Sequence, residues 1–112
     1  MNVDLYRGFE GEPAIVFSSA GGTIHCWSGY FDRLMEAVMP AATGWVGFAR
    51  HYHLLTGWRE EPRWVDPDPQ DTLRQLERTK DLDGGAQGLK DALVALYRAA
   101  IMEGGTVTFM EE

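Results

Sequence analysis

The sequence is poor in cysteine and contains no long apolar run. Cys26 is the only cysteine, so an internal disulfide is impossible and a disulfide-stapled secreted domain is excluded. No apolar stretch approaches the roughly 18 residues that a membrane-spanning helix requires. The first residues lack the basic and apolar regions of a secretory signal peptide. We therefore expect a cytoplasmic protein.

Positive charge is also scarce. Ten Lys and Arg residues stand against 17 Asp and Glu residues, which gives a formal net charge of -7. A negative field repels phosphate backbones and anionic lipid surfaces, whereas it speeds the encounter with a basic protein. The charge balance therefore argues against nucleic acid and membranes as partners, and it favours a basic protein.

The 112 residues have the length and composition of one globular domain. Hydrophobic residues make up 45% of the chain and charged residues 24%, which is close to the average for folded proteins. A chain of this size buries one core, so we expect a single domain over residues 1–112. The sequence does not predict an oligomeric state.

Two local patterns resemble ligand sites but lack their defining residues. The Ser-Ser-Ala-Gly-Gly stretch at residues 18–22 lacks the Lys-Ser/Thr of a phosphate-binding loop, and its glycines are typical of a tight turn. An acidic stretch that starts at Asp66 matches some positions of a calcium loop, but Asp71 stands where that loop needs glycine. We expect no metal and no cofactor.

Histidines give the only candidates for acid-base chemistry. His51 and His53 flank Tyr52, and on a helix this spacing places them on nearly opposite faces, whereas on a strand they share a face. His25 and Cys26 are adjacent, so on a strand they point in opposite directions and Cys26 faces the core. A small enzyme that combines His25, His51 or His53 with a carboxylate or Tyr52 remains an alternative.

Alternation and glycine-containing turns predict strands at both ends of the chain. Residues 3–6, 14–17 and 23–27 are the predicted N-terminal strands, and we expect them to form a β-meander. Residues 106–110 alternate as a last strand, with Val107 and Phe109 on one face. This strand is expected to join the N-terminal sheet.

Helical spacing of apolar residues fills the middle of the chain. Ser28 is the predicted cap of a first helix whose apolar stripe runs from Phe31 to Val38, and a less regular pattern covers residues 44–56. Residues 59–69 are predicted to be a loop. Asp68 caps a surface helix over residues 69–80, and the strongest helical pattern follows residue 85. The sequence predicts an α+β fold: a small antiparallel or mixed sheet covered on one face by three to four helices.

Tryptophan, arginine and carboxylates gather in a proline-rich stretch that continues into the surface helix. Trp and Arg often dominate the binding energy at protein interfaces, and a stiff loop loses little entropy when it docks. The tryptophans could instead cover the edge of the core, with the charges only solvating a long connection. The candidate partner-binding residues are Trp58, Glu60, Glu61, Arg63, Trp64, Asp66, Asp68, Asp71, Asp81 and Asp83.

Size, acidity and the lack of a catalytic motif together favour a protein-binding function. The hypothesis is a small inhibitor, similar in general character to the immunity proteins that neutralise basic, nuclease-type bacterial toxins by direct binding. Its carboxylates would occupy the place of the nucleic-acid phosphates. The alternatives are the small enzyme described above and a subunit or adaptor of a larger assembly.

Overall fold

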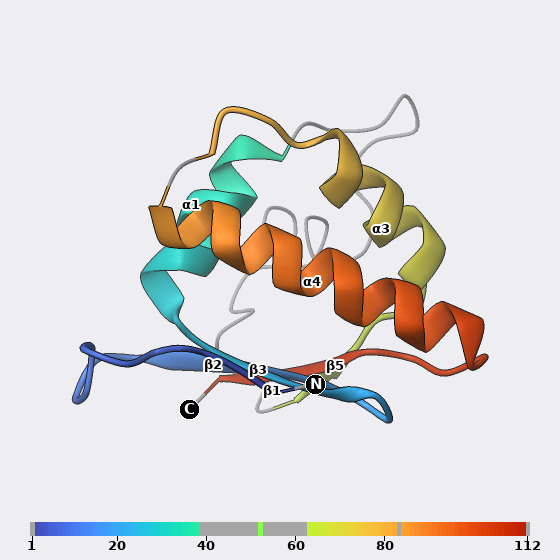
Figure 1. The fold of residues 1–112 in the computed structure, drawn as a ribbon, viewed down its shortest axis with the longest axis horizontal. Helices are drawn as coiled ribbons and strands as arrows, with labels where there is room; N and C mark the ends of the chain where they lie inside the picture. The colour runs from blue at the N-terminus through green and yellow to red at the C-terminus, as the bar shows by residue number, and fades with distance from the viewer. Residues whose placement is uncertain (1, 39–51, 53–62, 83, 112) are drawn as a thin grey trace.

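The computed structural model describes residues 2–38, 52, 63–82 and 84–111. In this part of the chain, five strands form a mixed sheet and three helices pack on one of its faces (Figure 1). The predicted α+β fold is confirmed. The elements are β1 (Asn2–Leu5), β2 (Ala14–Ser19), β3 (Gly22–Trp27), α1 (Ser28–Ala37), β4 (Trp64–Val65), α3 (Pro69–Arg78), α4 (Gly84–Met102) and β5 (Thr108–Glu111).

The N-terminal strands do not form a meander. The strand order is β1-β3-β2-β5-β4, so β1 and β2 are not neighbours. β2 pairs antiparallel with β3 on one side and with β5 on the other. Because both edges of β2 are occupied, β1 adds to the free edge of β3, and it does so in parallel, with Asn2 opposite Thr23 and Leu5 opposite Cys26. The expected meander is therefore wrong, although its three strands are present.

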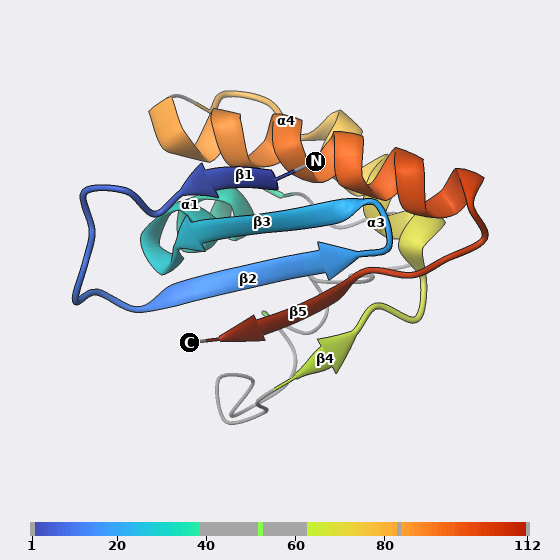
Figure 2. The same ribbon diagram turned by 60° about the horizontal axis from the view of Figure 1, so that its bottom comes forward.

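The last strand joins the N-terminal sheet as expected. β5 lies beside β2, and Phe109 is the partner of Phe17 in the register (Figure 2). Val107 and Phe109 are both buried on the side of the helices. The alternation of the C-terminal residues therefore predicted the buried face correctly.

The predicted loop at residues 59–69 contains a short strand. β4 consists of Trp64 and Val65, and these residues pair with Phe109 and Thr108 of β5. Residues 59–62 lie outside the described part. Two residues are too few to produce an alternating pattern, and prolines at positions 62 and 67 restrict the strand to the sheet edge. The loop prediction is wrong for these two residues.

α1 has the predicted apolar stripe but not the predicted cap. Phe31 and Val38 at the two ends of the stripe are buried, together with Leu34 and Met35 between them. Ser28 is the first helical residue, and its backbone N–H donates to the carbonyl of Pro13. The predicted second helix lies outside the described residues except for Tyr52, whose ring meets Phe31 edge-on.

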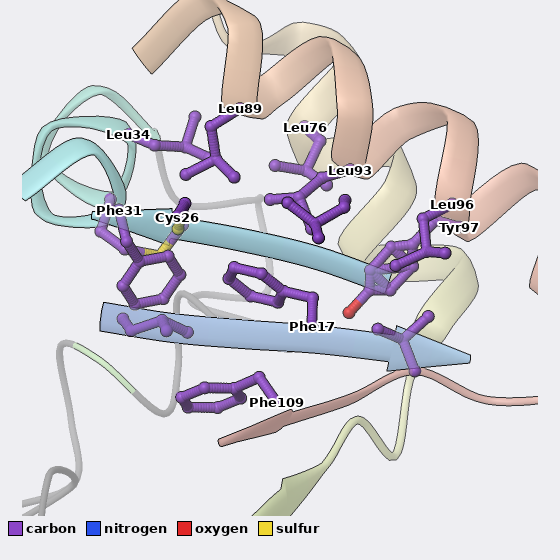
Figure 3. Packing of buried hydrophobic residues seen from close by; sticks show 14 of the residues in the cluster. Phe17, Cys26, Phe31, Leu34, Leu76, Leu89, Leu93, Leu96, Tyr97 and Phe109 are labelled. Carbon is purple, nitrogen blue, oxygen red and sulfur yellow. The ribbon is translucent and has the colours of Figure 1, made fainter. Parts of the chain in front are cut away.

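α4 closes the core over the sheet. Its predicted apolar face is confirmed, because Leu89, Leu93, Leu96, Tyr97 and Ala100 are buried while Ala92 is partly buried. Figure 3 shows Leu89, Leu93, Leu96 and Tyr97 projecting from α4 toward the sheet, where Phe17 and Phe109 lie. A single hydrophobic cluster thus joins the sheet to all three described helices.

Candidate protein-binding site

Asp66 is a buried carboxylate at the junction between β4 and α3. Its exposed fraction is 2%. One carboxylate oxygen, Oδ1, accepts the backbone N–H of Asp68 at 2.8 Å. The other, Oδ2, accepts the hydroxyls of Thr72 and Tyr97, each at 2.6 Å. A single side chain therefore connects the turn before α3 to both α3 and α4.

Burial changes the protonation of this cluster. Removal from water raises the pKa of Asp66, and this effect outweighs the three hydrogen bonds that favour its ionised form. Burial also raises the pKa of Tyr97, and the neighbouring Asp66 carboxylate raises it further. The hydroxyl of Tyr97 therefore stays protonated near neutral pH and remains a donor to Asp66.

The backbone at the same junction is fixed as well. The N–H of Asp66 donates to the carbonyl of Val107, and the hydroxyl of Thr106 donates to the carbonyl of Asp66. Both partners belong to the segment that leads into β5. The main chain of Asp66 thus anchors the following turn to the segment that leads into β5, and the side chain of Asp66 anchors the turn to α3 and α4.

The anchored turn displays Asp68 to solvent. Asp68 occupies the predicted N-cap position of α3, with Pro69 as the first helical residue, but its carboxylate makes no capping hydrogen bond. Asp66 holds the N-cap residue itself, because its carboxylate accepts the N–H of Asp68. The Asp68 side chain is exposed and lines an open hollow of about 330 Å³ formed by residues 67–71.

Asp71 lines the same hollow from the first turn of α3. Its carboxylate forms an ion pair of 2.9 Å with Arg74, and the side chains of Arg74 and Asp71 are 68% and 47% exposed. Exposed pairs of this kind contribute little stability, because solvent screens them and two long side chains lose freedom. The Asp71 carboxylate can therefore leave Arg74 and pair with a cation of a partner protein at a small cost in free energy.

The structure brings together only part of the predicted binding residues. Asp68 and Asp71 share the hollow, and Arg63 is exposed beside β4. Asp81 is exposed but follows the C-terminal end of α3, and a ten-residue helix is about 15 Å long. The remaining candidates Trp58, Glu60, Glu61 and Asp83 lie outside the described residues.

Two predicted binding residues face the core. Trp64 is half-buried, and its ring packs against Phe109 with centroids 5.2 Å apart. This is the covering role that the sequence left open as the alternative. Asp66 is buried with its carboxylate satisfied inside the protein, so in this structure it does not face a partner. Its contribution to a binding surface is indirect, through the turn that it holds.

The described histidine and the cysteine lie on opposite faces of β3, as expected. Cys26 is fully buried, and burial raises the pKa of its thiol to about 12, so the thiol stays protonated near neutral pH. His25 stacks on the ring of Tyr6 on the other face, with centroids 4.6 Å apart. His51 and His53 lie outside the described residues. Within the described ranges, no group of three or more His, Cys, Asp or Glu side chains is arranged to hold a metal ion.

Comparisons with known proteins identify no relative of this chain. No protein-family model, curated protein or solved structure matches the chain significantly. Among the described residues, no helix combines the length and the apolar character needed to cross a bilayer.

Proposed function

We propose that this chain is a small acidic inhibitor that binds a basic protein, of the immunity-protein kind that neutralises a nuclease-type bacterial toxin. The observation that carries the proposal is the anchored turn. Residues 67–71 present the carboxylates of Asp68 and Asp71 from a backbone held by the buried Asp66. The turn thus offers fixed negative charge at the surface of an acidic protein.

A fixed carboxylate is a better ligand for a cationic surface than a mobile one. Ordering a flexible loop on binding costs free energy, and a turn already held by hydrogen bonds avoids most of that cost. The formal charge of -7 attracts a basic partner over a longer range and raises the association rate. The carboxylates of the turn then take positions that phosphate groups of a nucleic acid would occupy on a nuclease.

The candidate interface around the turn includes the sequence-predicted residues that flank it. Arg63 is exposed beside β4, and the segment with Trp58, Glu60 and Glu61 directly precedes it in the chain. These residues stay predicted contributors. Asp81 lies beyond the far end of α3, so we place it at the border of the interface rather than at its centre.

Charge reversal at the turn tests the proposal. We expect a basic nuclease domain to be encoded beside this chain's gene, and we expect Asp68→Lys to weaken its inhibition by about 30-fold, because a carboxylate that faces partner cations becomes a repelling ammonium group. The measurement is the inhibition constant in a nuclease assay. Thermal unfolding is followed in parallel, and it should change little because Asp68 is exposed.

Glu36→Lys is the matched control. Glu36 is exposed on α1, away from the turn, and its reversal changes the net charge by the same amount. The control is expected to lose no more than about threefold, through the weaker long-range field alone. An equal loss for both variants would mean that only the total charge matters, and it would contradict a binding site at the turn.

A further inference from the structure

The face of the sheet opposite the helices carries an apolar strip near β4. Trp64 and Phe109 point into the core, so their chain neighbours Val65 and Met110 point outward. Val65 is 49% exposed and Met110 is 41% exposed. Val16 on β2 is the direct cross-strand partner of Met110. We call Val16, Val65 and Met110 the outer strip.

The outer strip is continuous across three strands. Thr108 lies between Val65 on β4 and Ser18 on β2 in the register, and Met110 follows two residues later on the same face. Side chains on neighbouring strands of one face are about 5 Å apart when directly paired and about 7–8 Å apart on the diagonal. The strip is thus an aliphatic centre bordered by hydroxyl groups, and Figure 2 shows the strands that carry it side by side.

The other end of the outer face is covered by the chain itself. Tyr6, directly after β1, stacks on His25 with centroids 4.6 Å apart, whereas Phe9 of the following loop stacks on Trp27 at the end of β3, beside Tyr30 of α1. The Tyr6 hydroxyl fixes the loop by donating to the carbonyl of Glu12 at 2.5 Å. The outer face is therefore packed intramolecularly at His25, whereas Val65 and Met110 keep large exposed surfaces.

Charges lie around the outer strip rather than within it. Asp4 is exposed on β1 and begins the cross-strand row that continues through His25 to Val16 and Met110. Asp68 follows Val65 by three residues, so the anchored turn lies at most about 10 Å of chain away. Arg63 adds one cation beside β4, while the protein as a whole carries a charge of -7. The borders therefore suit lysine and arginine side chains of a partner.

We propose that the outer strip is the apolar centre of the surface that docks a basic protein. The occupant is a partner surface in which an exposed apolar side chain lies between lysines or arginines. That side chain packs on Val65 and Met110 while the cations reach Asp68 and Asp4. This inference rests on the proposed function, since it assumes the same basic partner.

An apolar centre with charged residues around it is the usual composition of a protein interface. Binding energy concentrates in a few apolar contacts that become dry, and the charged rim mainly provides orientation and a fast association rate. A binding surface that had only acidic residues and no apolar centre would bind its partner through charge alone, and high salt would abolish that binding. The strip supplies the short-range contact that a specific inhibitor needs.

Two peptide probes of equal charge test the inference. One alternates lysine and leucine over seven residues, and the other has serine in place of leucine. We expect the leucine peptide to bind about tenfold more tightly, and to shift the amide NMR signals of Val16, Thr108 and Met110. In the double variant V65T/M110Q, which keeps side-chain size and strand preference, that advantage should fall to about twofold or less.

Met102→Gln is the matched control for the double variant. Met102 is 88% exposed at the end of α4, outside the outer face, so its replacement should leave both affinities unchanged. Unchanged thermal unfolding of V65T/M110Q would show that the double variant keeps its fold. If the variant does not fold, NMR mapping of the peptide on the wild-type protein still locates the binding surface.

The outcomes of these experiments distinguish the proposed role of the outer strip from the proposed recognition of a basic protein. Equal binding of the two peptides, shifts confined to the helical layer, or an unaffected double variant would overturn the role of the outer strip while leaving acidic recognition in place. If neither peptide binds, both proposals fail. A selective loss of the leucine peptide's advantage supports the inference.

Discussion

Replacing Asp66 with alanine is expected to lower the free energy of unfolding by about 3 kcal/mol. The variant removes the acceptor of three hydrogen bonds, which leaves the hydroxyls of Thr72 and Tyr97 and the N–H of Asp68 without this carboxylate. Buried donors that lose their partner cost more than the bond itself contributed. Urea denaturation followed by circular dichroism measures the change, and a loss below about 1 kcal/mol would contradict the anchoring role.

Asp66→Asn separates the charge of this side chain from its shape. The pKa of Asp66 is raised in the folded protein above the ordinary value of 3.8, so the folded state takes up a proton at a higher pH than the unfolded state. The wild type therefore gains stability as pH falls from neutral toward pH 4, and it loses that gain as pH rises through the raised pKa. The amide cannot titrate. The stability of the wild type relative to Asp66→Asn should increase on acidification, and a constant or decreasing difference would refute the raised pKa.

Phe17→Ala is expected to cost about 3–5 kcal/mol, the largest loss among the substitutions considered. Phe17 is fully buried in the middle of β2, and its ring lies 5.6 Å from Phe31 and 5.9 Å from Phe109, measured between centroids. Truncation leaves a cavity where the sheet, α1 and β5 meet (Figure 3). The midpoint of urea unfolding measures the loss.

Met102→Ala is the comparison for this core variant. It removes an apolar side chain of similar length from an exposed position, so its effect should stay within about 0.5 kcal/mol. A loss of less than about 1.5 kcal/mol for Phe17→Ala would show that the three rings do not form the centre of the core.

Features that depend on local spacing could be predicted from the sequence. The apolar stripe of α1, the wide face of α4 and the alternation of Val107 and Phe109 each repeat within a few residues. Strand order could not be predicted in the same way. The parallel pairing of β1 with β3 depends on β5, which lies far later in the chain and occupies the edge of β2 that β1 would take in a meander.

The roles of residues in the candidate site also depend on contacts with distant parts of the chain, so the sequence did not predict them. In the sequence, Asp66 and Asp68 look alike, since both are aspartates in one proline-rich acidic stretch. Their environments differ because Tyr97, 31 positions later, supplies a buried hydroxyl to Asp66 alone. Trp64, a predicted binding residue, instead covers the core, because the register with β5 turns the tryptophan inward. A two-residue strand gives no periodicity from which that direction could be read.

The salt dependence of partner binding tests the central claim most directly. The measurement is the Kd of the wild-type chain for a basic nuclease domain, which we expect to be encoded beside its gene, by calorimetry at about 20 mM and about 300 mM NaCl, where the screening length falls from roughly 20 Å to roughly 6 Å. Acidic recognition predicts tight binding at low salt and a Kd at least about tenfold higher at high salt. No binding at low salt, or a Kd that does not change with ionic strength, would contradict the account.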